Sequence, residues 1–369
     1  MRFPLVEYLQ WAKTVPRDVA LIGASGVPPV GPEELGLGAD DAPALDQRAN
    51  AYGSDRVRER IAARYGVTPA QVYPTEGTSL GNFLALAALL EGGGHAVVEA
   101  PVYTPYRQQV EALADAVDGL PRPFEAGFAI DPDALEARLR PETRVVALTD
   151  LHNPSGVRTP PDVMRELATR AARHGACLLV DEVYRDFLYD EEPSTAARLA
   201  PNIIATSSLT KVYGLGALRF GWIIGPATLV ERASRINDYL GVVQPAPSVA
   251  LGLRALDRLP ALTARSRALV ETARPVLRRW LDTRAELETV WPEAGPIVFP
   301  LLAGPAASRD TARLAAQLLE SARIGVVPGR FFGEPRGLRL GATAPVDVLE
   351  RGLGALAAAL AVPSPGATL

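Results

Sequence analysis

The sequence of residues 202–214 is NIIATSSLTKVYG, an apolar run that passes into small hydroxyl residues and then a single lysine, Lys211. The chain has 38 basic residues, of which only Lys13 and Lys211 are lysines. Arginine stays protonated in proteins, whereas a lysine amine can lose its proton and attack a carbonyl. The apolar run predicts a strand, and its hydroxyl-rich end suits a phosphate-bearing cofactor bound to Lys211 through an imine. A surface lysine is the alternative interpretation, and we adopt it for Lys13.

Short strands that are apolar throughout alternate with amphipathic helices from about residue 54 to residue 225. The expected strands are Ala96–Glu99, Arg144–Thr149, Ala176–Val180, Asn202–Thr206 and Phe220–Ile224. The expected helices are 54–65, Ser79–Leu90, a turn of helix near Tyr103–Ala112, and Pro161–His174. This alternation predicts an α/β fold with a mostly parallel, doubly wound sheet that is covered on both faces. Ligands bind such sheets beyond the carboxyl ends of the strands, where Lys211 is expected to lie.

The pattern changes after residue 240 and predicts a smaller α+β domain. We expect a long helix at about 261–290, strands near Ile297–Leu302, Ile324–Val327 and Leu338–Leu340, and helices at about 310–322 and 346–361. The expected division is an N-terminal arm with part of the small domain over 1–45, a large domain over 46–245, and a small C-terminal domain over 246–369.

The composition narrows the classes of function. With 369 residues, 48% of them apolar, the chain can bury the core of a globular protein. A net charge of −4 does not favour nucleic acid or an acidic membrane as a partner, and no apolar run is long enough to span a membrane. Cys177 is the only cysteine, which excludes an internal disulfide and favours a cytoplasmic location. One cysteine and three scattered histidines make a zinc site improbable.

Short motifs follow one another along the chain. They are Tyr52-Gly53, Glu76-Gly77-Thr78-Ser79, Pro101-Val102-Tyr103, His152-Asn153-Pro154-Ser155-Gly156, Asp181-Glu182-Val183-Tyr184, Ser208-Leu209-Thr210-Lys211 with Arg219, and Gly337-Leu338-Arg339-Leu340. Each alone has an ordinary alternative, such as a turn at Asn153-Pro154 or a surface pair at Asp181-Glu182. Together and in this order, the series resembles the class I/II aminotransferases of fold type I (aspartate-aminotransferase-like), which carry pyridoxal 5′-phosphate (PLP). The resemblance is weakest over the first 45 residues and over 241–320.

The resemblance implies a role for four residues around the reacting part of the cofactor. Lys211 matches the lysine that holds PLP as a Schiff base and moves a proton at the substrate's α-carbon. Asp181 matches the acid beside the pyridine nitrogen, which keeps the ring protonated so that it draws electrons. Tyr184 and Asn153 match residues that hydrogen-bond the 3′ oxygen. Lys211, Asp181 and Tyr184 are therefore the expected catalytic residues, and Asn153 is expected to contact both cofactor and substrate.

A phosphate site is expected at the start of the helix Ser79–Leu90. Gly77 and Thr78 open this helix, where backbone N–H groups and the helix dipole favour an anion. Thr78 or Ser79 can instead be a simple helix cap, and the two roles are compatible. Ser208 and Arg219 match the family's phosphate-binding serine and arginine.

The resemblance implies three further contacts. Tyr103 matches the aromatic residue that stacks on the pyridine ring, although an isolated tyrosine there is more often a core residue. Tyr52 matches a tyrosine that reaches the phosphate bound by the partner subunit, which implies a homodimer with shared active sites. Arg339 matches the arginine that binds the substrate's α-carboxylate in a two-pronged contact, with Arg336 as the alternative.

We therefore expect a homodimeric, cytoplasmic, PLP-dependent aminotransferase that moves an amino group from an amino acid to a 2-oxo acid in ping-pong half-reactions. The first alternative is a PLP-dependent carbon–sulfur β-lyase of the same fold, because the same motifs serve both reactions. A PLP-binding regulator without catalysis is a distant alternative, because the first 45 residues are too short and too rich in proline and glycine for a DNA-binding domain. A nicotinamide-binding protein is disfavoured by the lack of a Gly-x-Gly-x-x-Gly motif after the first strand.

Overall fold

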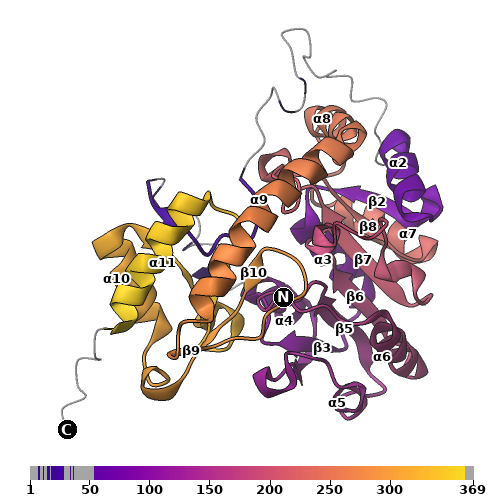
Figure 1. Cartoon of the computed structure of the whole chain (residues 1–369). Coiled ribbons are helices and arrows are strands. Elements are labelled where there is room, and N and C mark those ends of the chain that lie inside the picture. The colour runs from indigo at the N-terminus through magenta and orange to yellow at the C-terminus, as the bar shows by residue number, and fades with distance from the viewer. Residues whose placement is uncertain are drawn as a thin grey trace.

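The computed structural model describes residues 54–361 and, before them, residues 7–8, 11, 15–16, 18–28, 34 and 36. Tyr52 and Lys13 lie outside the described residues. One part of the molecule is built on a large sheet with helices around it, and a second part contains small sheets and the helices near the C-terminus (Figure 1). The long helix α9 (Leu259–Leu281) runs between the two parts.

The central sheet has seven strands in the order β2-β8-β7-β6-β5-β3-β4. Their bounds are β2 (Val72–Thr75), β3 (His95–Ala100), β4 (Ala116–Pro121), β5 (Thr143–Thr149), β6 (Cys177–Asp181), β7 (Ile203–Ser208) and β8 (Gly221–Ile224). All neighbouring pairs are parallel except those that involve β8, which is antiparallel to both β2 and β7. All five strands predicted between residues 54 and 225 are present in this sheet, and the mostly parallel α/β architecture is confirmed.

The strand β8 is the antiparallel member of the mostly parallel sheet, a direction that the sequence did not predict. A parallel partner for β7 would need a crossover connection, usually through a helix. The segment between β7 and β8 instead forms the loop that carries Lys211 and a 3₁₀ turn at Gly216–Leu218, and it returns the chain in the opposite direction. The strands β2 and β4 were not predicted: β2 is short, and β4 lies at the sheet edge with a partly exposed pattern that includes Asp118 and Gly119.

Helices cover both faces of the sheet. Successive side chains of each strand point to opposite faces, so each layer of helices packs on every second residue of a strand. On one face, α3 (Thr78–Leu89), α4 (Thr104–Leu113) and α7 (Ala227–Asn237) pack against residues that include Val98 and Val145. On the other face, α5 (Pro132–Glu136) and α6 (Pro161–Arg173) pack against their sequence neighbours Val97 and Val146. Such burial on both sides explains why these strands are apolar throughout.

The C-terminal elements form a separate apolar cluster with the start of the chain. They are the second half of α9, β9 (Leu287–Glu288), β10 (Ile297–Val298), β11 (Leu301–Leu302), α10 (Thr311–Ala322), β12 (Ile324–Gly325), β14 (Leu338–Gly341) and α11 (Val346–Ala361). The strand β13 (Val327–Pro328) pairs with β14. The helix α8 (Ala246–Asp257) and the first half of α9 pack instead in the cluster that contains residues of α2 (Asp55–Tyr65) and β8. The expected helix over 261–290 ends too late, because α9 stops at Leu281 and the chain then enters β9, which pairs with β11. The short strand β1 (Ala20–Leu21) pairs in parallel with β12, so the N-terminal segment packs beside the C-terminal helices (Figure 1). The domain boundaries stay a prediction.

Within the described part of the chain, no helix combines the length and the apolarity that a membrane span needs.

A further helix of the large part, α2, begins after the N-cap Ser54 and is followed by Gly66, which has the left-handed backbone conformation.

A buried ion pair joins β3 to the edge of the site. The side chains of Glu99 and Arg122 are both fully buried, and Arg122 Nη1 donates to Glu99 Oε2 at 2.8 Å. The second oxygen, Oε1, accepts from the backbone N–H of Thr149 at 2.7 Å and from its hydroxyl at 2.5 Å. Burial raises the pKa of Glu99, whereas Arg122 and Thr149 oppose this shift. The pair therefore holds the end of β5 against β3.

Removal of one partner of this buried ion pair should destabilise the folded protein. We expect Glu99→Ala to lower the free energy of unfolding by about 3–5 kcal/mol, because it leaves the Arg122 charge buried and unpaired. The matched control is Glu111→Ala, which removes the partner of Arg107 at 2.7 Å on the surface of α4. This control should lower the free energy of unfolding by only about 0.5 kcal/mol. Urea unfolding of both variants measures the difference, and equal losses would contradict the buried pairing.

Candidate active site

A cavity of about 550 Å³ lies beyond the carboxyl ends of β5, β6 and β7. Its lining consists of Tyr8, Ser25, Thr78, Ser79, Tyr103, Thr149, Asn153, Asp181, Val183, Tyr184, Ser208, Thr210, Lys211, Arg219 and Arg339. Every site residue expected from the sequence is in this lining except two. Gly77 immediately precedes Thr78, and Tyr52 lies outside the described residues. The structure thus brings together side chains that are far apart in the sequence.

Lys211 lies in the loop after β7 and is half-buried. Its Nζ donates to the hydroxyl of Ser25 at 3.3 Å. The segment that carries Ser25 also packs on the lysine, because Val27 N–H donates to the Lys211 carbonyl at 3.1 Å. A side chain added at Gly26 would place its Cβ 3.3 Å from Lys211 Cδ. The described N-terminal segment therefore forms one wall around the lysine side chain.

Asp181 ends β6 and is almost fully buried at the cavity. Its Oδ2 accepts from Asn82 Nδ2 at 2.8 Å, and its Oδ1 accepts from the backbone N–H of Val183 at 3.0 Å. Burial raises the pKa of Asp181, whereas these two hydrogen bonds and the charge of Lys211 oppose the shift. Asn82 is itself oriented by Thr206, whose hydroxyl donates to its amide oxygen. The carboxylate is thus held in one orientation by α3 and β7.

Arg339 extends from β14 into the cavity and is 1% exposed. Its Nη1 donates to Asn153 Oδ1 at 2.9 Å and its Nη2 donates to the Tyr8 hydroxyl at 3.1 Å. Its Nε is buried and has no hydrogen-bond partner among the described residues. A buried guanidinium without a carboxylate beside it fits an anionic ligand. Arg336, the alternative, is exposed and pairs with Glu334 at 3.4 Å outside this cavity.

The start of α3 forms a second place for an anion. Gly77 precedes the helix with φ +82°, and a Cβ added there would lie 2.5 Å from Arg219 Nη2. Thr78 donates its hydroxyl to Ser208 Oγ at 2.8 Å, and Arg219 Nη2 donates to the Glu76 carbonyl at 3.0 Å. A helix N-terminus, two hydroxyls and an exposed guanidinium thus meet at one end of the cavity.

Tyr103 and Tyr184 also line the cavity. Tyr184 is buried, and Tyr103 donates its backbone N–H to the Asn153 carbonyl at 3.2 Å. Sequence reasoning missed Tyr8, Ser25, Thr149 and Asn82. Asn82 was within reach of that reasoning, because it lies four positions after Thr78 and therefore on the same side of the expected helix. Tyr8 precedes any recognisable pattern, so no signal pointed to it.

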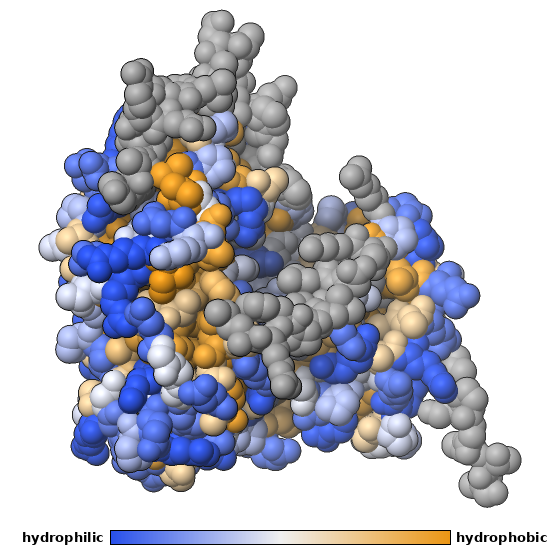
Figure 2. Space-filling model, turned by 180° about the vertical axis from the view of Figure 1, so that it is seen from behind, coloured by the Kyte–Doolittle hydropathy of each residue, from blue (hydrophilic) through white to orange (hydrophobic). Residues whose placement is uncertain are grey.

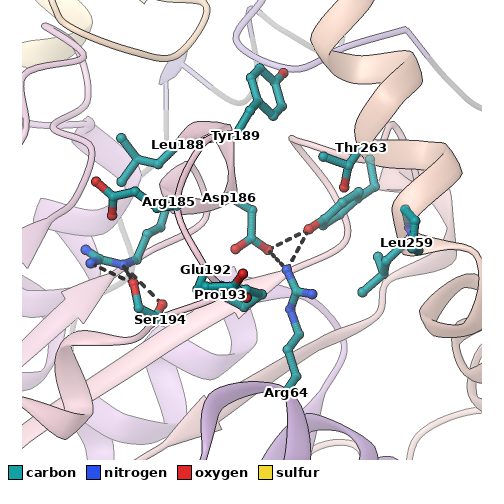
Figure 3. A pocket seen from close by; sticks show the side chains of 13 residues that line it. Arg64, Arg185, Asp186, Leu188, Tyr189, Glu192, Pro193, Ser194, Leu259 and Thr263 are labelled. Carbon is teal, nitrogen blue, oxygen red and sulfur yellow. Dashed lines mark hydrogen bonds and ion pairs between the residues drawn. The ribbon is translucent and has the colours of Figure 1, made fainter.

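A smaller pocket of about 270 Å³ is lined by residues of α2, of the segment after β6 and of the start of α9, and by Tyr213 (Figure 3). At its wall the Tyr213 hydroxyl donates to Asp186 Oδ2 at 2.7 Å, and Arg64 Nη2 donates to the same oxygen at 3.0 Å. Tyr213 is two residues after Lys211, and Asp186 is two residues after Tyr184. The hydrogen bonds among Tyr213, Asp186 and Arg64 therefore connect the lysine loop to the segment after β6 and to α2.

Comparison with known proteins identifies the family. The family model described as aminotransferase class I and II matches residues 30–356. The chain belongs to this family. It is 33% identical to capreomycidine synthase of Streptomyces vinaceus over 83% of this chain and 79% of that protein. It is 27% identical to an aspartate aminotransferase of Streptomyces avermitilis over 79% of this chain and 76% of that protein.

A solved structure has a similar fold over nearly the whole chain. The crystal structure of the PLP-dependent cyclase OrfR is similar with a TM-score of 0.83 and 28% identity, covering 98% of this chain and 97% of that one. Membership of the family makes PLP the cofactor of this chain.

The described residues fit this cofactor on their own chemistry. The cavity offers a lysine amine, a buried carboxylate and, at the start of α3, donors for a phosphate. The hydroxyl of Thr210, next to Lys211, is buried without a hydrogen-bond partner among the described residues. Gly77 leaves the space beside Arg219 that a side chain would fill.

We predict that Gly77→Ala weakens PLP binding by roughly tenfold or more. An alanine there is strained at φ +82° and displaces the Arg219 guanidinium, which lies 2.5 Å from the new Cβ position. Gly354→Ala in α11 is the matched control, because its Cβ would meet no atom within 4 Å. Titration of the cofactor-free variants with PLP measures both affinities. If Gly77→Ala bound PLP as well as the control does, the phosphate would lie elsewhere.

Proposed function

We propose that this protein is a PLP-dependent aminotransferase that moves an amino group from an amino acid to a 2-oxo acid in two half-reactions. The observation that carries the proposal is that Lys211, the only lysine among the described residues, shares one cavity with Asp181 and Arg339. These side chains supply an amine, an anion and a cation within a single site. The membership of the aminotransferase family supports the same reaction.

The cofactor, when bound, supplies an aldehyde for an imine and a ring that accepts electrons from the substrate's α-carbon. In the proposal, Lys211 Nζ would hold the cofactor through that aldehyde. The lysine amine would also be the base that takes the proton from the substrate's α-carbon and the acid that gives it back. Asp181 holds a proton on the ring nitrogen, because an anion beside that nitrogen favours its charged form.

The substrate is held by groups on the opposite side of the cavity. Arg339 is proposed to bind the α-carboxylate with both of its Nη groups. Nη1 keeps one N–H beyond that given to Asn153, and the second N–H of Nη2, which donates to the Gly23 carbonyl over 3.4 Å, would be shared with the carboxylate. This contact would orient the Cα–H bond toward Lys211. Tyr184 and Asn153 are proposed to donate to the cofactor's 3′ oxygen. Thr78, Ser208 and Arg219 would hold its phosphate, and Tyr103 would stack on the ring.

We also infer a homodimer, in a cytoplasmic protein. The loop after α7 exposes three large apolar side chains, Tyr239, Leu240 and Val242, at 90%, 55% and 54% of their surface. Apolar residues also gather on the sheet-bearing part of the molecule in the view from behind (Figure 2). Exposed apolar surface of this kind is typical of a protein interface. The contact of Tyr52 with a partner's phosphate stays a prediction, because Tyr52 lies outside the described residues.

A second candidate is chemistry at the substrate's β-carbon. The similarity to the PLP-dependent cyclase OrfR, and to capreomycidine synthase at 33% identity, favours a reaction other than amino transfer, and we assign a cyclisation to this second candidate. A carbon–sulfur β-lyase belongs to the same candidate, because it also uses a lysine base and an electron-accepting ring. A preference for aspartate or glutamate has no support, because Arg219 and Arg339, the arginines among the described lining residues, both have other proposed roles.

One experiment separates the two candidates. The purified PLP-bound protein is mixed with a panel of amino acids, and the absorbance of the cofactor and the products are followed together. Conversion of the cofactor to its amine form, with release of a 2-oxo acid, supports the aminotransferase. Release of ammonia or of a cyclised product, without this conversion, would replace it by the β-carbon reaction.

Lys211 offers the first test of a residue's role. Borohydride reduction followed by peptide mapping should place the cofactor on Lys211. Lys211→Arg should retain the positive charge yet show no turnover and no reducible link, because a guanidinium does not form the imine. Lys13→Arg is the matched control and should behave as the wild type does. A cofactor mapped to Lys13 would overturn the proposal.

Asp181 offers the second test. Asp181→Asn should still bind PLP but lose roughly a thousandfold in kcat, if a charged hydrogen bond worth ~4 kcal/mol in the transition state disappears. Asp131→Asn, at the exposed N-terminus of α5, is the matched control and should leave the rate unchanged. Steady-state kinetics with the donor found above measures both. A rate within a few-fold of the wild type would assign the ring nitrogen's partner to another residue.

A further inference from the structure

Tyr8 is a cavity residue that the family motifs do not include. It precedes the main described part of the chain and lies beside Arg339, whose Nη2 donates to its hydroxyl at 3.1 Å. On the other side, Arg339 Nη1 donates to Asn153 Oδ1 at 2.9 Å. The guanidinium is thus held at both of its outer nitrogens, by Asn153 on one side and by Tyr8 on the other.

The ring of Tyr8 is fixed by aromatic contacts. Its centroid lies 5.0 Å from that of Tyr103 and 5.5 Å from that of Phe331, both in edge-to-face geometry at 84°. The Arg339 Cζ atom is 5.8 Å from the centre of the Tyr8 ring. Edge-to-face pairs and cation–π contacts each stabilise such an arrangement. The hydroxyl is therefore placed at the wall of the cavity by packing rather than by its own hydrogen bond alone.

The phenolic proton of Tyr8 is free to be donated. A tyrosine hydroxyl can accept one hydrogen bond and donate another at the same time. Tyr8 accepts from Arg339, and within the described part of the chain no acceptor receives its proton. Burial opposes ionisation of the phenol, but the charges of Arg339 and Lys211 and the hydrogen bond from Arg339 lower the pKa of Tyr8 below its ordinary value. A more acidic O–H group is a stronger donor to an anion.

We propose that Tyr8 donates its phenolic O–H to the substrate's α-carboxylate beside Arg339, and is thus a further substrate-binding residue. This inference rests on the proposed function, in which Arg339 binds that carboxylate. The N-terminal segment then contributes directly to recognition of the substrate, in addition to closing the cavity around Lys211. A ligand that has an amine but lacks the carboxylate gains nothing from this contact.

Two probes isolate the carboxylate. In 2-aminoisobutyrate the amine-bearing carbon carries two methyl groups and a carboxylate, and in tert-butylamine a third methyl group replaces the carboxylate. Neither has a proton on that carbon, so binding to the PLP-bound protein is measured at equilibrium without proton removal there. The dissociation constants are obtained from the absorbance of the cofactor and from calorimetry for the wild type and three variants: Tyr8→Phe, Arg339→Gln and Tyr189→Phe. Tyr189 donates to or accepts from Ser266 at 2.7 Å away from this cavity, and its variant controls for loss of a phenolic hydroxyl.

The wild type should prefer 2-aminoisobutyrate. Tyr8→Phe should weaken binding of 2-aminoisobutyrate by roughly tenfold or more, as expected for a lost hydrogen bond to a charged group, and leave tert-butylamine unchanged. Arg339→Gln should weaken 2-aminoisobutyrate further, and Tyr189→Phe should change neither.

The other outcomes separate the two claims. If Arg339→Gln is selective for the carboxylate but Tyr8→Phe binds both probes as the wild type does, this inference is overturned and the proposed function stands. Equal weakening of both probes by Tyr8→Phe also overturns it, because Tyr8 would then only shape the cavity. If Arg339→Gln has no effect, or the wild type shows no preference for the carboxylate, the role proposed for Arg339 fails and the inference fails with it.

Discussion

Two buried charges of opposite sign, Asp181 and Arg339, reach the same cavity, and neither forms an ion pair with another described residue. Burial of an unpaired charge is unfavourable, and proteins usually compensate it with a partner of opposite charge. Here each charge is held by neutral donors or acceptors instead: Asn82 for the carboxylate, Asn153 and Tyr8 for the guanidinium. The two charges come from different parts of the fold, β6 and β14, and line one cavity with Lys211. We therefore expect a cationic group of the ligand to pair with Asp181 and an anionic group to pair with Arg339.

The order of the strands explains how this arrangement arises. Asp181, the loop of Lys211 and the end of β5 come from adjacent strands whose carboxyl ends share one edge of the sheet. Arg339 comes from β14, in the C-terminal part, and the N-terminal segment joins that part through the pairing of β1 with β12. The cavity thus lies where the two parts of the molecule meet, which is where ligand sites in proteins of this kind are often found.

Much of this arrangement was predictable from the sequence, because the features that carry it are local. The apolar run before Lys211 predicted β7, and the polar residues at the ends of the apolar strands predicted which side chains would meet. The direction of β8 was not predictable from its apolar pattern, since that pattern is the same for a parallel and an antiparallel buried strand. Tyr8 was not predictable either, because its role depends on a contact with Arg339 that no local pattern encodes. Asn82 could have been found from its place four positions after Thr78, but its partner Asp181 could not. The end of α9 at Leu281 was missed because the residues that follow it have no strong stop signal.

The same polar arrangement serves an aminotransferase and an enzyme that acts at the β-carbon. Both need a base beside the α-carbon, an anion beside the ring nitrogen and a cation for the carboxylate. The two candidates differ in what leaves the substrate after the α-proton, and this depends on the groups that surround the β-carbon. The buried charges of Asp181 and Arg339 would serve both reactions in the same way.

A crystal structure of the PLP-bound protein with 2-aminoisobutyrate tests the central claim most directly. The account predicts that the ring nitrogen lies within hydrogen-bond distance of Asp181, about 2.7–3.2 Å, and that the carboxylate lies at the same distance from both Nη atoms of Arg339. Lys211 should then be released from the cofactor, with its amine facing the substituted carbon. A ring nitrogen directed away from Asp181, or a carboxylate bound without Arg339, would contradict the claim that these two charges are completed by cofactor and substrate.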